Sequence, residues 1–206
     1  GCDFPILRIS TELCEAEISL YGAQVLQWTP TGQLPVIFMS PKAVFAQGKA
    51  LRGGIPLCWP WFGKNTENPA LPSHGVARIS LWQHAGTEEL EDGTVRIILA
   101  LPPTQELMPS GAVIIELGRE LQVSLLTLDV QRSMPFSAAM HTYFAVSDYE
   151  QVAITGLEEC DFTEFAADAE PHCEDPLIPV GHIDRIYYPV AEEQEITIHD
   201  PAWERS

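Results

Sequence analysis

The sequence predicts an all-β protein, an antiparallel β-sandwich, and two observations carry this prediction. Apolar and polar residues alternate with a period of two in several short segments, whereas no long segment shows the period of a helix. The 206 residues include 17 prolines and 14 glycines, which would interrupt most long helices but are tolerated between short strands. We therefore expect many short strands joined by turns.

The strands follow from these patterns in chain order. In Cys14–Tyr21, small and apolar residues alternate with polar ones, as in a half-buried strand. One face would carry Cys14, Ala16, Ile18 and Leu20, and the other Glu15, Glu17 and Ser19. Runs rich in β-branched and apolar residues predict further strands. These are Val95–Leu101, Ala112–Leu117, Leu121–Val130 and Glu195–His199.

Turn residues separate the predicted strands. They are Thr31-Gly32, Asp92-Gly93, Pro102-Pro103, Pro109-Ser110-Gly111 and Leu117-Gly118. Phe162–Pro179 is acidic and poor in large aliphatic residues, which predicts an exposed loop. No internal repeat, low-complexity tract or linker divides the chain, so we expect a single β-sandwich domain over residues 1–206.

The composition argues against several classes of function. With 29 acidic and 11 basic residues, the formal charge of -18 would repel nucleic acids and anionic lipids, so we expect neither as a partner. No apolar run approaches the roughly 20 residues of a membrane-spanning helix, and no secretory signal is visible. The five cysteines are scattered without a CxxC pair, which is typical of reduced thiols in a cytoplasmic protein. Dispersed histidines and missing nucleotide-binding motifs predict no metal and no cofactor.

The charge reverses in one part of this acidic chain. Ser40–Trp82 contains a single acidic residue, Glu67, and five basic ones. The basic residues are Lys42, Lys49, Arg52, Lys64 and Arg78. Gathered cations indicate a common anion, and the alternative is surface pairing with carboxylates elsewhere in the chain.

A shaped loop is predicted within this stretch at Arg52–Lys64. It combines glycines, prolines and three aromatic rings between flanking cations. Glycine lets a backbone approach a ligand, proline stiffens a loop, and aromatic faces suit the C–H surface of a sugar. The alternative is a buried aromatic turn.

Two histidines are candidates for a site. His74 lies in Ser73–Arg78, beside a glycine, and the alternative for it is an ordinary loop histidine. His141 interrupts the small and apolar segment Met134–Phe144, so we expect it to be largely dehydrated in a strand. Imidazole can give and take a proton near neutral pH, which makes His141 a candidate proton donor. The alternative is a core histidine that donates to a backbone carbonyl.

An adjacent acid and base, Asp184 and Arg185, lie in the strand-like run Ile183–Tyr187. Neighbouring side chains in a strand point to opposite faces. One of the two could therefore face a ligand while the other fixes the loop, and the alternative is an ordinary exposed pair.

Four motifs taken in order resemble one known family. RGGIPLCWPWFG, HGVAR, FSAAMHTYF and IDRIY are similar to motifs of the D-hexose-6-phosphate mutarotases, the glucose-6-phosphate 1-epimerase branch of the aldose 1-epimerase family. The resemblance extends from Leu7 to His199. It implies the large antiparallel sandwich of galactose mutarotase-like proteins and an isomerase that interconverts the α and β anomers of a hexose 6-phosphate such as glucose 6-phosphate.

The resemblance also implies a role for each matching residue. His141 would be the catalytic acid that protonates the ring oxygen, while a carboxylate takes the proton from the C1 hydroxyl. Arg52 and Arg78 would bind the phosphate, with Lys64 as a helper. His74 and Asp184 would bind the sugar hydroxyls.

The family's catalytic base is a glutamate in a C-terminal segment, and no motif before Ser206 matches it. We therefore expect the base beyond Ser206 and a chain that lacks this segment. Two alternatives stay open, a non-catalytic carbohydrate or sugar-phosphate binding module of the same fold and an epimerase of unphosphorylated aldoses. The paired arginines argue against the second, because a neutral sugar needs no cations. We expect a monomer whose partner is a small hexose phosphate.

Overall fold

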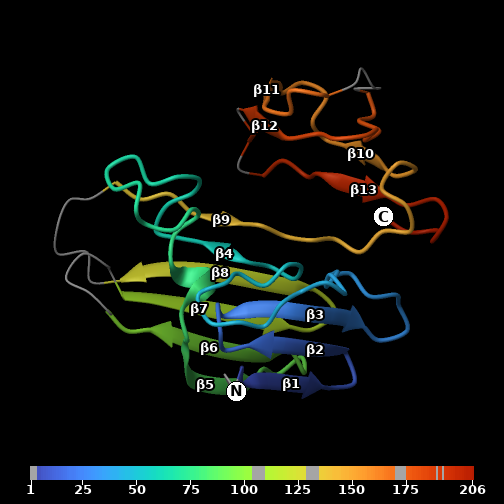
Figure 1. Ribbon diagram of the computed structural model, residues 1–206. Helices are drawn as coiled ribbons and strands as arrows, with labels where there is room; N and C mark the ends of the chain where they lie inside the picture. Colours follow the sequence, from blue (N-terminus) through green and yellow to red (C-terminus); the bar gives the residue numbers. More distant parts are fainter. Residues whose placement is uncertain (1–3, 104–109, 129–134, 170–174, 189, 192) are drawn as a thin grey trace. The chain divides into compact units, whose positions relative to one another are not determined.

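The computed structural model describes residues 4–103, 110–128, 135–169, 175–188, 190–191 and 193–206. These residues form short strands and one 3₁₀ turn, η1 (Ala77–Ile79), so the all-β prediction is confirmed (Figure 1). Every pair of named strands among them is antiparallel. The chain divides into two compact units, Gly1–Ala145 and Val146–Ser206, each with its own strands.

The first unit begins with a three-stranded sheet. Its strands, in the order β1-β2-β3, are β1 (Ile6–Ser10), β2 (Cys14–Ser19) and β3 (Gln24–Pro30). The predicted alternation holds along β2 until Ser19, which is fully buried although it falls on the polar face. The register between β2 and β3 skips Leu26, which makes a bulge there. Leu26 packs with Tyr21 and Leu51 in a second small core, so this end of the sheet is covered on both faces.

A four-stranded sheet forms the other layer of the first unit. Its strands, in the order β5-β6-β7-β8, are β5 (Gln83–Glu89), β6 (Val95–Leu101), β7 (Ser110–Leu117) and β8 (Leu121–Leu128). β6 has the predicted bounds. β7 starts earlier than predicted, so the turn expected at Ser110-Gly111 is wrong. Gly111 belongs to the strand because its missing side chain lets the ring of Trp59 pack closely. Pro109, Asp129 and Val130 lie outside the described residues.

The two sheets of the first unit face each other across its main hydrophobic core (Figure 1). The alternating inward residues of β2, β3, β6 and β7 fill this core, as expected for a sandwich. Cys14 and Cys58 are buried, Cys160 of the second unit is half-buried, and none of these three described cysteines forms a disulfide. Within the described part of the chain, no helix is long and apolar enough to cross a membrane.

A short ladder joins two distant segments of the first unit. β4 (Leu57–Cys58) pairs with β9 (Ala139–Met140). Three of the four sequence motifs lie on or beside this pairing.

The second unit consists of two small sheets. β10 (Ala153–Thr155) pairs with β13 (Thr197–His199), and β11 (Asp161–Glu164) pairs with β12 (Arg185–Tyr188). β13 is two residues shorter at its start than predicted. The exposed loop expected at Phe162–Pro179 is wrong in part, because β11 occupies its beginning and Leu177 near its end is buried. Residues 170–174 of that segment lie outside the described residues.

Candidate functional site

The β4–β9 ladder brings the Arg52–Lys64 loop beside the segment that carries His141. The backbone N–H of His141 donates to the carbonyl oxygen of Pro56 at 3.0 Å, and that of Tyr143 donates to Gly54 at 2.9 Å. These bonds extend the two-residue ladder on one side. Two motifs separated by about 80 residues in sequence are therefore neighbours in the first unit.

The motif Ser73–Arg78 docks on the same loop. The carbonyl oxygen of Trp59 accepts the N–H groups of Val76 at 3.0 Å and Ala77 at 3.1 Å, and Gly63 accepts that of His74 at 2.7 Å. Gly75 has φ of +74°, and a side chain there would collide with the carbonyl oxygen of Trp59. The glycine thus permits the close approach that sets His74 beside the loop.

His74 is held by the loop against which it packs. Its Nδ1 accepts the backbone N–H of Gly63 at 3.3 Å, and its ring meets the ring of Phe62 edge to face at 4.9 Å between centroids. Because Nδ1 accepts, a neutral His74 carries its proton on Nε2. Nε2 is thus the donor nitrogen left for a hydroxyl.

Three of the predicted site residues interact electrostatically. Burial lowers the pKa of His74 below its ordinary value, and the positive charges of Arg78 and His141 lower it further. Arg78 acts on a second neighbour as well, because burial raises the pKa of the Cys58 thiol while the charge of Arg78 opposes the rise. The segments that carry His74, Arg78 and His141 meet at the Arg52–Lys64 loop, through the hydrogen bonds to Trp59, Gly63 and Pro56.

Arg78 uses part of its hydrogen-bonding capacity within the protein. One Nη donates to the carbonyl oxygen of Ser73 at 2.9 Å, and its Nε is buried with no partner among the described residues. A buried donor without a partner is costly and uncommon. The guanidinium is therefore fixed at one end and keeps donors that no described group satisfies.

His141 is exposed, so the expectation that it would be dehydrated is wrong. Its ring stacks on that of Tyr143, with centroids 5.0 Å apart and an interplanar angle of 30°. Its apolar neighbours Met140 and Phe144 are exposed as well, and this explains the error, since apolar neighbours need not lie in a core. Within the described residues, no hydrogen bond or ion pair joins the imidazole to a carboxylate.

Arg52 and Lys64 are exposed at the two ends of the loop. The backbone of Arg52 is anchored, because its carbonyl oxygen accepts the N–H of Ser40 at 3.2 Å. Lys64 directly follows Gly63, which binds His74. No described contact joins either cationic head group to Arg78 or to the histidines.

The cations of Ser40–Trp82 differ from several others in the chain. None of them forms an ion pair with a described carboxylate, whereas Arg8, Arg96 and Arg185 all do. Surface pairing, the alternative explanation for the local charge reversal, thus has no support within the described ranges.

The aromatic residues of the loop divide between core and surface. Trp59 is fully buried, and its Nε1 donates to Thr127 at 3.0 Å, so the alternative of a buried aromatic turn is correct for this residue. The Nε1 of Trp61 donates to Pro72 at 3.0 Å. Phe62 is 44% exposed and is the loop ring most open to a ligand.

Asp184 and Arg185 belong to the second unit, where they divide as predicted. Asp184 is exposed, whereas the side chain of Arg185 is only 8% exposed and donates from Nε to Glu164 at 2.7 Å. Arg185 also donates to the hydroxyl of Tyr187 at 3.0 Å and lies 3.9 Å above the ring of Phe162. It is therefore a structural residue and not a free cation.

Glu164 connects Arg185 to Asp184, a link that the sequence did not reveal. One of its carboxylate oxygens accepts from Arg185, and the other accepts the backbone N–H of Asp184 at 3.0 Å. The carbonyl oxygen of Asp184 accepts the N–H of Phe165 at 2.7 Å. The backbone of Asp184 is thus held from both sides while its carboxylate stays exposed.

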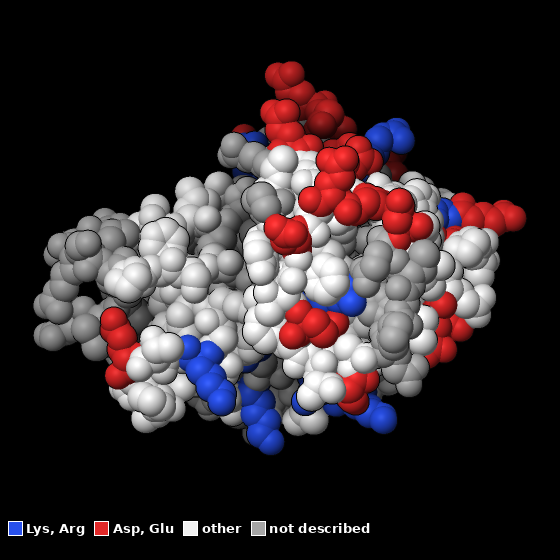
Figure 2. All heavy atoms as spheres, turned by 90° about the horizontal axis from the view of Figure 1, so that it is seen from above, with Lys and Arg blue, Asp and Glu red and all other residues white. Residues whose placement is uncertain are grey.

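The second unit carries most of the negative charge. Its 16 acidic and 2 basic residues give a formal charge of -14, against -4 for the first unit. Acidic side chains predominate over basic ones on the face in Figure 2. An anionic ligand is therefore better matched to the cations of the first unit.

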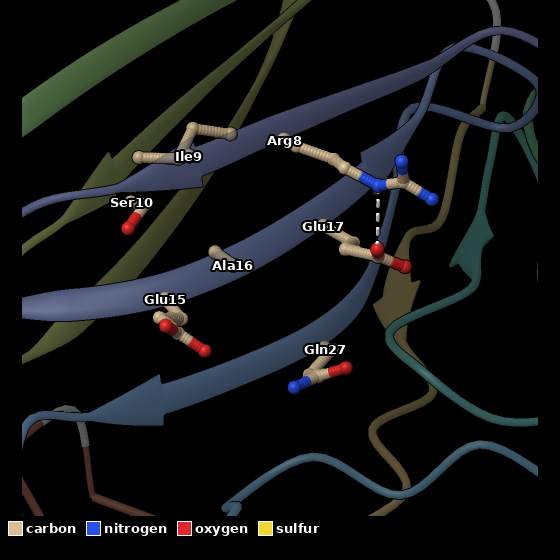
Figure 3. Close-up of a pocket in the computed structure, with 7 residues that line it drawn as sticks. All are labelled: Arg8, Ile9, Ser10, Glu15, Ala16, Glu17 and Gln27. Atoms are coloured by element: carbon tan, nitrogen blue, oxygen red, sulfur yellow. Dashed lines mark hydrogen bonds and ion pairs between the residues drawn. The ribbon is translucent and has the colours of Figure 1, made fainter.

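Two described hollows lie over the β1–β3 sheet, and the second also reaches the segment 39–45. Figure 3 shows one of about 180 Å³, where Arg8 pairs with Glu17 at 2.9 Å. A neighbouring hollow of about 320 Å³ shares Glu17 and Gln27 with it. None of the predicted site residues lines either hollow, and no metal-binding group of His, Cys, Asp and Glu occurs among the described residues.

Comparisons with known proteins agree on one family. The sequence profile described as Aldose 1-epimerase matches residues 5–205. An Escherichia coli K12 protein named "Putative glucose-6-phosphate 1-epimerase" is 34% identical over 146 residues, which cover 69% of this chain and 49% of that protein. A Cenchrus ciliaris protein of the same name is 30% identical over 223 residues, 97% of this chain and 65% of that protein.

A solved structure shares the fold. The crystal structure of a mutarotase, named putative, from Salmonella typhimurium superimposes with a TM-score of 0.70 at 29% identity, over 82% of this chain and 57% of that one. The chain spans about half the length of the first curated relatives it matches.

Proposed function

Because the chain belongs to the aldose 1-epimerase family, we propose that the protein interconverts the α and β anomers of hexose 6-phosphates such as glucose 6-phosphate. The observation that best supports this is the cluster that His74, Arg78 and His141 form where their segments meet at the Arg52–Lys64 loop. Such a cluster supplies a proton donor and an anion-binding group on a single surface.

His141 is the proposed acid of the reaction. It gives a proton to the ring oxygen while a carboxylate takes the proton from the C1 hydroxyl, so the C1–O5 bond breaks and an aldehyde forms. Rotation about C1–C2 presents the other carbonyl face, and closure with the proton transfers reversed yields the other anomer. Each positioned proton transfer contributes roughly 10²–10⁴-fold. By resemblance to the family, the carboxylate is a glutamate of the C-terminal segment.

Arg52 and Arg78 are proposed to bind the 6-phosphate, with Lys64 nearby. A guanidinium fork offers two parallel donors to a phosphate, and these bonds are stronger than neutral ones. The absence of described carboxylate partners for these cations supports this assignment. The names of the relatives agree with a phosphorylated substrate.

His74 of the first unit is proposed to bind a sugar hydroxyl, and Asp184 of the second unit is assigned such a role only by its resemblance to the family. A neutral His74 donates from Nε2, as its hydrogen bond to Gly63 requires. The exposed carboxylate of Asp184 accepts from hydroxyls, and Phe62 offers an apolar face to the C–H groups of the ring.

The test follows fresh α-glucose 6-phosphate as it relaxes to anomeric equilibrium, by polarimetry, with protein expressed from the complete gene. His141→Ala should lose at least about 100-fold in the catalysed rate. The matched control is His84→Ala, which removes an exposed histidine from β5 and should keep the rate.

A non-catalytic sugar-phosphate binding module is the second candidate. It is favoured if the complete gene encodes no glutamate that matches the family's catalytic base. If the wild-type protein binds glucose 6-phosphate but relaxes it no faster than buffer does, the binding module is the correct reading.

A further inference from the structure

Gln24 is a polar side chain placed entirely inside the first unit. It begins β3, its exposed fraction is 0%, and its Nε2 donates to the carbonyl oxygen of Gly53 at 2.6 Å. Its Oε1 is also buried and has no partner among the described residues. The unpaired Oε1 costs stability, and among the described contacts of this amide only the hydrogen bond to Gly53 offsets that cost.

The carbonyl group that Gln24 binds belongs to a tightly confined turn. Gly53 and Gly54 have φ of +112° and +66°, a conformation that other residues rarely adopt. A Cβ on Gly53 would lie 2.6 Å from the Cα of Met39. The N–H of Gly54 donates to Phe38 at 2.8 Å, and its carbonyl oxygen accepts from Tyr143 at 2.9 Å. The backbone of this turn is therefore closely confined by Phe38, Met39 and Tyr143.

The peptide between Gly53 and Gly54 lies immediately after Arg52. Leu51 and Gly53 are buried, whereas Arg52 between them is exposed. The bond from Gln24 draws the carbonyl oxygen of Gly53 into the core and so fixes the orientation of the chain at this point. That orientation sets the direction in which the Arg52 side chain extends into solvent.

We propose that Gln24 is a positioning residue that holds Arg52 toward the 6-phosphate and thereby sets the preference for phosphorylated over free hexoses. This inference rests on the proposed function. A small displacement of a binding group is costly, since about 1 Å of misplacement can lose about 10²-fold in rate. The positioning of Arg52 thus explains why Gln24, with its unpaired Oε1, is present in the core.

The experiment compares kcat/KM for glucose 6-phosphate with kcat/KM for glucose, using protein expressed from the complete gene. Gln24→Met keeps the length of the side chain and removes the donor. The ratio of the two values should fall by roughly tenfold or more, because the Gly53 carbonyl loses its anchor and a misplacement of Arg52 by about 1 Å can cost up to about 10²-fold. A merely structural role would lower both values together and leave the ratio unchanged.

Two further variants keep the test decisive. Gln27→Met makes the same change at an exposed position of β3 and should leave the ratio as in wild type. Gln24→Leu also lacks a donor, and it carries the test if Gln24→Met does not fold. Folding is checked by circular dichroism and thermal unfolding.

Arg52→Ala separates failure of this inference from failure of the proposed function. If Arg52→Ala leaves the ratio unchanged, the proposed phosphate site is wrong, and the role of Gln24 is lost with it. If Arg52→Ala lowers the ratio while both Gln24 variants leave it unchanged, only the inference about Gln24 is overturned. The double variant Gln24→Met with Arg52→Ala should be no worse than Arg52→Ala alone, because both changes remove the same contact.

Discussion

The Nε of Arg185 donates to one carboxylate oxygen of Glu164 at 2.7 Å, and the other oxygen accepts the backbone N–H of Asp184 at 3.0 Å. This single carboxylate therefore links an almost buried arginine to the residue proposed to bind a sugar hydroxyl. The adjacent acid and base seen in the sequence do not act as a pair. They act through a third residue 20 positions earlier in the chain.

The hydrogen bond from Arg185 lowers the pKa of Glu164 to about 2, from an ordinary value of 4.5. A carboxyl group whose pKa is depressed on folding stabilises the folded state above its unfolded pKa, and this contribution is lost as the pH falls through the folded pKa. Wild type should therefore exceed Glu164→Gln in thermal stability at pH 6, and the gap should shrink between about pH 4.5 and pH 2. Glu193→Gln, at an exposed position, is the control. A gap that stays constant down to pH 2 would contradict the described pair.

Removing the two proposed phosphate-binding arginines should affect phosphorylated ligands selectively. Charge-assisted hydrogen bonds contribute about 1.5–3 kcal/mol each, so Arg52→Ala with Arg78→Ala should weaken glucose 6-phosphate binding by about 100-fold or more. Glucose binding should change by less than about tenfold. Calorimetric titration of both sugars measures this, with Arg8→Ala on β1 as the control. Equal losses for the two sugars would refute the assignment.

Gly75 should be essential for docking the His74 motif on the loop. Gly75→Ala would place a Cβ against the carbonyl oxygen of Trp59, in addition to the cost of positive φ. Gly63→Ala is a matched control, because Gly63 has φ of +75° and no atom within 4 Å of its added Cβ. Urea unfolding should show Gly75→Ala to be less stable than Gly63→Ala by about 2 kcal/mol or more. Similar free energies of unfolding for the two variants would mean that Gly75 does not closely approach the carbonyl oxygen of Trp59.

The pKa of His74 reports on the charged cluster. It should lie below its ordinary value because His74 is partly buried beside Arg78 and His141. Arg78→Gln should raise this pKa, because the variant removes a positive charge that disfavours the imidazolium. Titration of the imidazole resonances by NMR measures the change, and Lys42→Gln serves as the control. If His74 titrates identically in wild type and Arg78→Gln, the two side chains are not neighbours.

Local patterns predicted the strands well where one face of a strand packs and the other is exposed. Val95–Leu101 has the predicted bounds because this run of β-branched and apolar residues is paired with a strand on each side. The prediction failed at Ser110-Gly111, where turn residues lie in a strand. Their placement depends on Trp59, which is distant in the sequence and packs against Gly111.

The site could be predicted only as a set of motifs. Residue types and charge identified Arg78, His74 and His141, and the β4–β9 ladder explains why they meet. The exposure of His141 could not be predicted, because its apolar neighbours are exposed too. Gln24 and Glu164 were missed, since each acts through a backbone group at least 20 residues away, and such contacts leave no local pattern.

The rate of anomer exchange in glucose 6-phosphate tests the central claim most directly. Exchange NMR measures it at equilibrium, with protein expressed from the complete gene added at increasing concentration. The rate should rise in proportion to wild-type protein and return to the buffer rate with His141→Ala. A rate that is independent of wild-type protein, or that is unchanged by His141→Ala, would contradict the claim.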